Sequence, residues 1–329
     1  LASIAALGTA ANKILYTTGV DTWVEAAITA TGRSIIDDDS VSAVRATILT
    51  EPKNRIINGD FRVAQRGTSF TGSTVPPATD DTYLLDRWNN IIGQADRFTV
   101  SQETSIIPPN SGVAGRVAFA IKFVTEAANA KGGMVQILES KDCVGMAGNA
   151  VSLQFKCLAS NTRIGKIRGA IISWVGTADA VTSDVFSTWP ADDESIAAGK
   201  LATSWTLEGE LSQTISAQDT WYTVKLENVS IDTSNTKQIA VIIWIDDTSY
   251  NYGDYFVIAD VQLELGAACT QFTVRPYAQE LALCQRYCYA ITNAVANEVI
   301  GMGIATANNQ STYVNMPLPV EMFAIPTLT

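Results

Sequence analysis

Residues 255–265 read YFVIADVQLEL, and this stretch decides the fold class. Apolar side chains recur at every second position from Tyr255 to Leu265. After Ala259 they alternate with the polar residues Asp260, Gln262 and Glu264. A period of two is that of a β-strand with one face in the core, because successive side chains point to opposite faces of the sheet. The stretch therefore predicts a long β-strand.

The same alternation recurs at 117–123, 151–157, 205–211 and 222–226, and residues 239–245 are apolar on both faces, as in a central strand. Turn-forming residues separate these runs at 108–112, 132–133, 145–149 and 246–253. No helical pattern interrupts the series. These features predict an antiparallel two-sheet sandwich over residues 54–275, of the jelly-roll kind.

The first 53 residues have few large apolar side chains. Residues 14–18 and 22–26 predict a hairpin, and a helical pattern follows that opens at Ser34 or Asp37. A hairpin and one short helix cannot bury a core alone. We therefore expect residues 1–53 to be an attachment, oligomerisation or shaft segment.

The pattern of apolar and polar residues changes again after Pro276. One short helix is expected there, followed by strands at 299–305 and 311–316. Residues 276–329 are thus predicted to hold a helix and the start of a further, truncated β domain. Because the chain begins at Leu1 and stops within a strand-like pattern, we expect it to be a segment of a longer polypeptide.

Composition excludes several functions. The 329 residues include no histidine, so Ser-His-Asp chemistry and histidine-ligated zinc are excluded. A net charge of −11 without a basic run disfavours nucleic-acid binding. The longest apolar stretch, 239–245, is far shorter than the ~20 residues of a membrane span. Glycoside hydrolysis needs only two carboxylates, so a depolymerase stays a third hypothesis, but we predict that the chain is not an enzyme.

The five cysteines predict free thiols rather than a disulfide framework. Their number is odd and no CxxC motif occurs. Cys143, Cys157 and Cys269 lie in or beside apolar segments, as buried thiols do. Cys284 and Cys288 are four residues apart, but no histidine is available to complete a metal site with them.

Aromatic residues beside polar loops are the candidate ligand contacts. Sugars stack their C–H faces on aromatic rings and place their hydroxyls on amides and carboxylates. The candidate carbohydrate-binding residues are Trp189, Trp244, Asp247, Tyr250, Asn251 and Tyr252. The alternative is that the tryptophans are core anchors, namely Trp88, Trp174, Trp205, Trp221 and Trp244. For the loop 246–252 both interpretations stay open.

A calcium site is a further hypothesis. Asp60 and Asp260 lie on the first and last expected strands of the sandwich, which are neighbours in a closed jelly roll. Carboxylates at strand ends suit a hard cation. The alternative is a pair of ordinary exposed aspartates.

Five short motifs resemble one known module. They are NRIINGDFRVAQRG at 54–67, LDRW at 85–88, VQLELG at 261–266, TQFTVRP at 270–276 and ELALCQRY at 280–287. Together they are similar to the jelly-roll module common in bacteriophage tail-fibre and adhesin proteins. Residues 1–53 resemble the repeats by which phage fibres attach to a baseplate or continue a shaft.

The resemblance implies a virion-borne, homotrimeric tail fibre that is extracellular when assembled. Its implied partners are other tail or baseplate proteins and a host-surface glycan, with no cofactor required. In such modules the NGDF-like strand and an aspartate on the last strand share a calcium ion, and Asn58, Asp60 and Asp260 match in type. Ala259 stands where many such modules carry a second aspartate. The alternative function is a purely structural spacer or adaptor, with recognition located elsewhere. Burial of Trp189, Tyr250 and Tyr252 together would favour the spacer.

Overall fold

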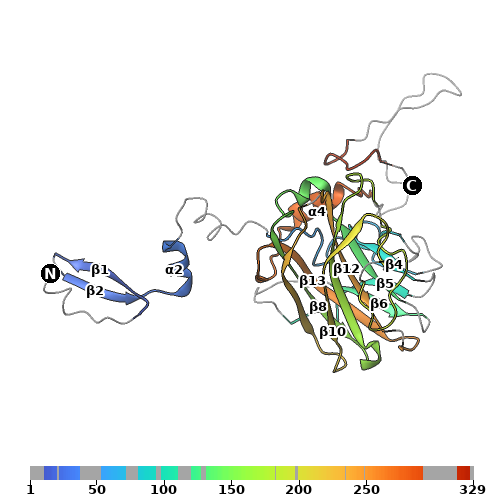
Figure 1. Cartoon of the computed structure of the whole chain (residues 1–329), viewed down its shortest axis with the longest axis horizontal. Coiled ribbons are helices and arrows are strands. Elements are labelled where there is room, and N and C mark those ends of the chain that lie inside the picture. The colour runs from blue at the N-terminus through green and yellow to red at the C-terminus, as the bar shows by residue number, and fades with distance from the viewer. Residues whose placement is uncertain are drawn as a thin grey trace, which may run out of the picture. The chain divides into compact units, whose positions relative to one another are not determined.

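The chain forms two compact units, Leu1–Glu51 and Pro52–Thr329, shown in Figure 1. The computed structural model describes residues 11–20, 22–37, 53–71, 81–93, 98–109, 120–126, 131–181, 183–196, 199–233, 235–247, 249–291 and 317–326. Among these residues, no helix has the length and apolar character needed to cross a membrane.

The smaller unit opens with the predicted hairpin. Strands β1 (Lys13–Gly19) and β2 (Thr22–Ala27) pair antiparallel. Lys13 and Glu25 form an ion pair of 3.2 Å across the two strands. The prediction of two short strands about a tight turn is confirmed.

The helix of this unit begins earlier than predicted. Helix α2 spans Ala30–Ile36, and the hydroxyl of Thr29 caps it by accepting a hydrogen bond from the Gly32 N–H. Asp37 is its C-terminal cap, so a helix start at Ser34 or Asp37 is wrong. Threonine is a favoured N-cap residue, because its hydroxyl accepts a hydrogen bond from a backbone N–H of the first turn that would otherwise be unpaired. The helix therefore begins directly after Thr29. The continuation at Val41, Val44 and Ile48 lies outside the described residues.

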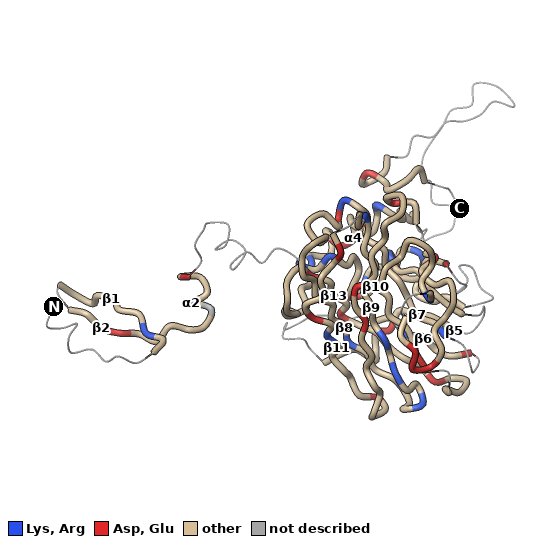
Figure 2. The backbone as a smooth tube through the Cα atoms, viewed as in Figure 1, with Lys and Arg blue, Asp and Glu red and all other residues tan. Residues whose placement is uncertain are grey.

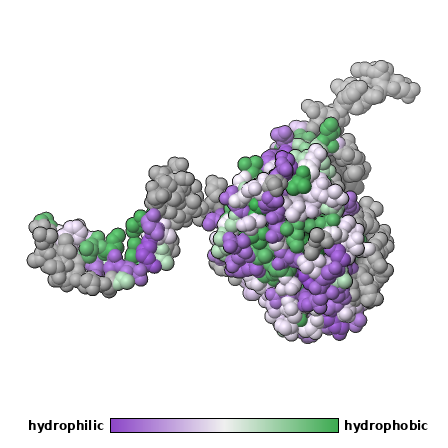
Figure 3. Space-filling view, in the orientation of Figure 1, coloured by the Kyte–Doolittle hydropathy of each residue, from purple (hydrophilic) through white to green (hydrophobic). Residues whose placement is uncertain are grey.

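The small unit leaves large apolar side chains exposed. Figure 3 shows apolar residues gathered along one side of it. The exposed ones are Ile14, Leu15, Tyr16, Val20 and Ile36. This agrees with the argument that so short a segment lacks a core of its own, and its role in oligomerisation stays a prediction.

The larger unit is an antiparallel sandwich of two sheets, which confirms the predicted fold class (Figure 1). The five-stranded sheet has the order β10 (Trp205–Thr214), β9 (Lys166–Trp174), β12 (Gln238–Ile245), β7 (Gly132–Ile137), β4 (Asn89–Ile92). The six-stranded sheet has the order β11 (Tyr222–Ser230), β8 (Ala150–Ala159), β13 (Tyr255–Leu265), β6 (Ala120–Thr125), β5 (Phe98–Glu103), β3 (Ser69–Phe70). Among its described residues the unit also contains two short 3-10 helices, η1 (Ser140–Cys143) and η2 (Thr162–Ile164), and the helix α4 (Tyr277–Gln285).

The alternating residues of the strands fill the space between the sheets. On β12, Ile239, Val241 and Ile243 belong to this core, together with Phe256 and Ile258 of β13. A second apolar cluster lies on the other face of β12, where residues from the segment 175–204 cover Ala240, Ile242 and Trp244. Burial on both faces explains why residues 239–245 are apolar throughout, as the sequence indicated.

The pair Gly132–Gly133 was predicted as a turn, and this is wrong, because both residues lie within β7. A Cβ on Gly133 would lie 2.1 Å from the carbonyl oxygen of Ile243, and one on Gly132 would lie 2.4 Å from the ring of Phe98. Glycine is required here because the neighbouring strand and ring approach the backbone so closely.

Helix α4 packs on the sandwich within the same compact unit, whereas the sequence predicted a boundary at residue 276. Cys284 of α4 is buried against Ile57 and Val63. Arg275 and Glu280 join this helix to residues 54–58 through buried hydrogen bonds. The strands predicted at 299–305 and 311–316 lie outside the described residues.

The five cysteines are free, as predicted. Cys143, Cys157 and Cys284 are buried, whereas Cys269 and Cys288 are half-buried. Burial raises the pKa of the Cys157 thiol to about 12, so this side chain acts as a small apolar core residue.

Glu139 organises a second polar contact between α4 and the sandwich. Arg286 donates to both carboxylate oxygens, at 2.7 and 3.0 Å, and the Tyr287 hydroxyl donates to one of them. The guanidinium of Arg87 lies 3.6 Å from the centre of the Tyr287 ring. Burial raises the pKa of Glu139, but the hydrogen bonds from Arg286 and Tyr287 outweigh it and lower the pKa to about 2.

This carboxylate makes folding stability depend on pH. Its pKa is lower in the folded chain than the ordinary value of 4.5, so its contribution is complete above about pH 4.5 and is lost as the pH falls toward 2. We expect Glu139→Gln to lower the free energy of unfolding by on the order of 2–3 kcal/mol at pH 6. Urea unfolding at pH 6, 4 and 3 checks this. A difference between the two proteins that stays constant over this range would contradict it.

Candidate functional site

The six predicted carbohydrate contacts do not form one site. Trp244 and Tyr250 have 0% and 1% of their surface exposed, so both are core residues and their prediction as sugar contacts is wrong. Trp244 faces the cover segment 175–204 and packs near Phe186, and Tyr250 packs near Phe98 in the inter-sheet core. Trp244 lies on β12, a regular strand that is apolar on both faces, and the ring of Tyr250 packs into the core from the adjoining loop. The polar residues next to them in the sequence therefore do not place these two side chains at the surface.

The other predicted contacts lie nearer to solvent. Tyr252 is 79% exposed and Asn251 is exposed, while Asp247 is half-buried and accepts a hydrogen bond from the Ser249 N–H at 2.9 Å. The Asn251 N–H donates to Asp254 at 2.8 Å, as is usual in a turn. Tyr252 is thus the one ring of the loop 246–252 that is open to a ligand, and it stays a candidate.

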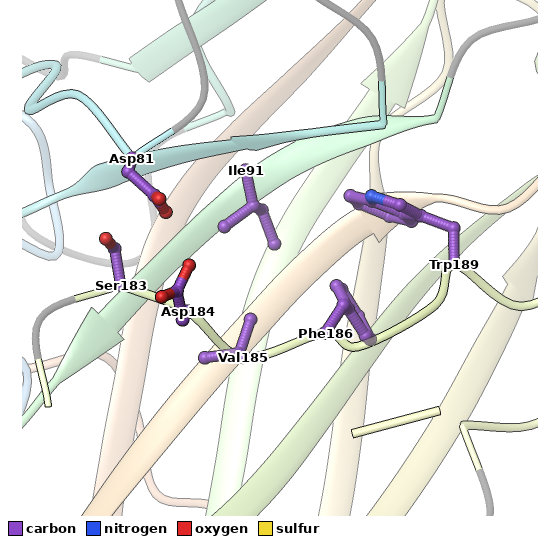
Figure 4. Close-up of a pocket in the computed structure, with 7 residues that line it drawn as sticks. All are labelled: Asp81, Ile91, Ser183, Asp184, Val185, Phe186 and Trp189. Carbon is purple, nitrogen blue, oxygen red and sulfur yellow. The ribbon is translucent and has the colours of Figure 1, made fainter. Parts of the chain in front are cut away.

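Trp189 lines a small pocket between β4 and the segment 183–189, shown in Figure 4. The other lining residues are Asp81, Ile91, Ser183, Asp184, Val185 and Phe186. Its volume is about 30 Å³. One water molecule needs about 10–15 Å³ of such space, so the pocket has room for about two waters and is too small for a sugar ring.

A larger groove lies on the outer face of the six-stranded sheet. Its volume is about 240 Å³, close to the lower end of the roughly 300–1,000 Å³ that small-ligand sites occupy. We call it the Lys156 groove, and it is lined by Gln154, Phe155, Lys156, Thr223, Asp260, Gln271 and Phe272. Its side chains offer amides, a carboxylate, an ammonium, a hydroxyl and an aromatic ring.

The register of the strands places these groups together. Thr223 of β11 lies opposite Lys156 of β8, and Lys156 lies opposite Ala259 of β13. The register of β13 then shifts between Ala259 and Gln262, and Asp260 in this bulge has φ of +53°. A bulge re-aims a side chain that a regular strand would direct elsewhere, and Asp260 here lines the groove.

Two side chains of β13 hold the wall of the groove. Glu264 accepts hydrogen bonds from the Thr270 N–H at 2.7 Å and from its hydroxyl at 2.6 Å. Gln262 accepts one from the Thr273 N–H at 2.8 Å. These bonds fix residues 270–273, which include Gln271 and Phe272, against the sheet. The groove is therefore preformed rather than made by a loose loop.

The groove is lined by one cationic and one anionic side chain, which form an ion pair. The Lys156 ammonium lies 3.1 Å from the Asp260 carboxylate, which is buried. An ammonium has three donors, so Lys156 can bind Asp260 and a ligand hydroxyl at the same time. Figure 2 shows acidic and basic residues interspersed over both sheets rather than gathered in one stripe. The groove suits a neutral polyhydroxyl ligand better than a polyanion.

Two aromatic side chains extend this face beyond the groove. Trp221 and Tyr255 pack over an apolar strip of Ala120, Leu158, Val257 and Ala259. Trp221 immediately precedes β11 and lies two residues before Thr223 in the chain. Burial and the nearby Asp219 carboxylate raise the pKa of Tyr255, and its hydroxyl donates to Asp219 at 3.3 Å.

The predicted calcium ligands have other partners. Asn58 donates to the carbonyl groups of Val63 and Asp86 and accepts from the Val63 N–H. Asp60 lies 3.2 Å from Arg62, and Asp260 has Lys156 beside it. The segments are neighbours as expected, since the Val261 N–H donates to the Gly59 carbonyl at 2.9 Å.

Cationic side chains therefore stand beside both carboxylates, and the amide of Asn58 is engaged with the backbone. This donor set does not fit an oxygen cage for Ca²⁺. Among the described residues, no group of three histidine, cysteine, aspartate or glutamate side chains could hold a metal ion. Calcium at Asn58, Asp60 and Asp260 stays a prediction without support from these contacts.

Sequence reasoning missed the Lys156 groove except for Asp260, which it assigned to a metal. The signal was present in residues 222–226 and 151–157, whose polar members Thr223, Gln154 and Lys156 share one face. This pattern did not predict a site, because polar residues on the outer face of a sheet are ordinarily just solvated. The contribution of residues 270–273 depends on long-range hydrogen bonds that no local pattern encodes.

No protein-family model and no curated protein matches the sequence. Solved structures of similar shape include a putative sugar binding protein from Bacteroides thetaiotaomicron, 17% identical, which covers 65% of this chain and 100% of its own at a TM-score of 0.36. The carbohydrate-binding module TmCBM61 with β-1,4-galactotriose is 12% identical and covers 65% of this chain and 99% of its own at a TM-score of 0.35.

The enzymatically active domain of tailspike protein 4 from bacteriophage CBA120 is also similar. It is 13% identical and covers 66% of this chain but 22% of its own, at a TM-score of 0.36. Identities of 12%, 13% and 17% with TM-scores of 0.35, 0.36 and 0.36 carry no functional argument. The fold assignment rests on the strand order and register described above.

Proposed function

We propose that the chain is a carbohydrate-binding structural module and that the Lys156 groove is its ligand site. The observation that carries the proposal is the composition of the groove. Gln271 offers a planar amide, Asp260 and Lys156 a charged pair, and Phe272, of which 8% is exposed, part of an aromatic ring, while the Gln154 amide already donates to the Thr270 carbonyl. This is the combination that sugars require, since hydroxyls need polar partners and C–H faces need apolar ones.

The wider role we propose is that of a phage tail fibre that mediates attachment to a host-surface glycan. The support is the motif series at 54–67, 85–88 and 261–287, together with the exposed apolar residues of the small unit. In this role the chain forms a homotrimer on the virion and joins other tail or baseplate proteins. Three weak sites presented together bind more persistently than one.

A glycan array probed with the full chain tests the ligand class. We expect wild type to bind one group of related saccharides, with single-site affinity of about 1 mM. Thr223→Trp places a bulky ring in the groove and should weaken binding at least tenfold. Its matched control is Thr206→Trp, an exposed threonine on the edge strand β10 of the other sheet, which should bind as wild type does.

Two results would contradict the proposal. One is a folded wild-type chain that binds no saccharide on the array or on host cells. The other is equal binding by wild type and Thr223→Trp. In the first case the spacer function would take its place. The burial of Trp189, Tyr250 and Tyr252 together that would favour the spacer is not found, because Tyr250 is buried but Trp189 is half-buried and Tyr252 is 79% exposed.

We propose that the chain is not an enzyme. Glycoside hydrolysis needs two carboxyl groups on either side of the scissile bond. Among the described residues that line the Lys156 groove, Asp260 is the sole acid, and it pairs with Lys156. Asp81 and Asp184 do line a common pocket, but a volume of about 30 Å³ excludes a sugar residue.

A further inference from the structure

The bulge in β13 decides which side chains reach the Lys156 groove. Between Ala259 and Gln262 this strand has two residues opposite a single residue of β8. In a regular strand Asp260 would lie on the face opposite to Ala259, inside the core, because successive side chains alternate. The bulge instead keeps Asp260 on the outer face, where it lines the groove and lies 3.1 Å from Lys156.

The bulge also sets the faces of the residues that follow it. Val261 and Leu263 lie in the inter-sheet core. Gln262 and Glu264 alternate with them and hold the wall segment 270–273 by hydrogen bonds. A shift by one residue would exchange the faces of these two pairs. The acidic side chain of the groove and the wall of the groove therefore both depend on the bulge.

The segment that opens the larger unit binds the backbone of β13 beside the bulge. The Asn54 side chain donates to the Val261 carbonyl at 2.9 Å and accepts from the Leu263 N–H at 3.1 Å. The Val261 N–H donates to the Gly59 carbonyl at 2.9 Å. The Arg55 N–H donates to the Leu263 carbonyl at 2.7 Å. All four backbone groups of these two strand residues are thus bound, which matters because a buried group left unpaired costs free energy.

Asn54 supplies two of these four hydrogen bonds from one side chain. It is 2% exposed, and its amide offers the donor and the acceptor that two positions of one strand need. Its side-chain oxygen also accepts from the Ile56 N–H at 2.9 Å, and its own carbonyl accepts from Arg275. The approach is close, since a Cβ on Gly59 would lie 2.1 Å from the Val261 carbonyl oxygen. The bulge and this segment therefore fit together as one rigid contact.

We propose that Asn54 is a positioning residue of the Lys156 groove. It is not part of the described lining of the groove, and it precedes Val261 by 207 residues in the chain. By holding the bulge it keeps the Asp260 carboxylate beside the Lys156 ammonium and keeps the wall in place. The effect on ligand affinity rests on the proposed function of the groove, whereas the effect on the bulge is measured without a ligand.

Hydrogen exchange of the ligand-free full chain, followed by mass spectrometry, tests the hold on the bulge. In Asn54→Ala, peptides within residues 258–265 should exchange about tenfold faster than in wild type, because two hydrogen bonds to the strand are lost. If Asn54→Ala does not fold, Asn54→Asp takes its place. Aspartate keeps the acceptor and loses the donor, so the change should have the same direction. Equal exchange in wild type and the folded variant would overturn the inference.

Gln238→Ala is the matched control for the loss of a buried amide. Gln238 is 2% exposed and also bonds two backbone groups, the Asp179 N–H at 2.9 Å and the Leu138 carbonyl at 3.1 Å. It lies on β12 of the other sheet. Its removal should lower the stability in a similar way but leave the exchange of residues 258–265 unchanged. Faster exchange of that stretch in both variants would show a general loosening and contradict a specific role of Asn54.

A double-variant cycle with a saccharide from the array tests the effect on the site. Asn54→Ala should weaken binding about tenfold, while Gln238→Ala binds as wild type does. Asp260→Gly removes the acidic side chain, and glycine adopts the left-handed backbone at this position, where φ is +53°. In the Asp260→Gly background the loss caused by Asn54→Ala should shrink to about threefold or less, because the two residues act together.

The outcomes separate this inference from the proposed function. Saccharide binding by wild type with unchanged affinity in Asn54→Ala would overturn the inference and leave the proposed function standing. The same holds for a full tenfold loss in the Asp260→Gly background. A folded wild type that binds no saccharide would remove the proposed function, and the exchange of residues 258–265 would then decide the role of Asn54 by itself.

Discussion

Replacing Arg275 with methionine is expected to lower the free energy of unfolding by about 3–5 kcal/mol, because it leaves a buried carboxylate without its main partner. The guanidinium donates to both oxygens of Glu280, at 3.1 and 3.2 Å, and to the Ile56 carbonyl at 2.8 Å. Arg275 and Glu280 are 7% and 3% exposed. After the substitution, Glu280 keeps the Asn58 N–H and a distant Arg62.

Urea unfolding followed by tryptophan fluorescence measures this loss. Six of the seven tryptophans lie in the larger unit, all except Trp23, so the signal reports the sandwich. The matched control is Arg163→Met, which removes a half-exposed partner of Asp254 and should change the stability little. The double variant Arg275→Met with Glu280→Leu should recover part of the loss, since no buried charge remains. Simple addition of the two single losses would contradict a coupled pair.

Trp244→Ala is expected to lower the free energy of unfolding by about 3–5 kcal/mol. The indole is fully buried between β12 and the cover segment, at 6.0 Å from the Phe186 ring. Within the described residues its N–H has no hydrogen-bond acceptor. Trp244→Phe removes that donor while filling much of the volume, so it should cost far less than the alanine variant.

The exposed Tyr252 provides the control for this experiment. Tyr252→Ala should leave the unfolding free energy within about 0.5 kcal/mol of wild type. If Trp244 were a ligand contact on the surface, its removal would affect binding and spare stability. An unchanged unfolding midpoint for Trp244→Ala would therefore contradict the core assignment.

The sequence predicted the sandwich because its longest strands alternate without interruption. Residues 255–265 form the long strand β13, but a bulge at Asp260 changes which residues face the core after Ala259. A period of two does not reveal a bulge. Strand β7 was missed because Gly132 and Gly133, which suit a turn, are required by the close approach of Phe98 and Ile243.

The motif series proved most informative about architecture. Asn54, Asn58, Arg275 and Glu280, from motifs more than 200 residues apart, meet in one buried hydrogen-bond network. These residues tie α4 to the start of the sandwich, so their chemistry is structural. The groove depends instead on cross-strand register and on the placement of residues 270–273, which sequence alone does not specify.

The central claim is that the Lys156 groove binds carbohydrate. A crystal structure of the chain with a saccharide identified on the array tests it most directly. We predict a sugar ring stacked beside Phe272, with hydroxyls within hydrogen-bond distance of the Lys156 ammonium and the Gln271 amide. A saccharide bound beside Tyr252, with the groove filled by water alone, would contradict the account.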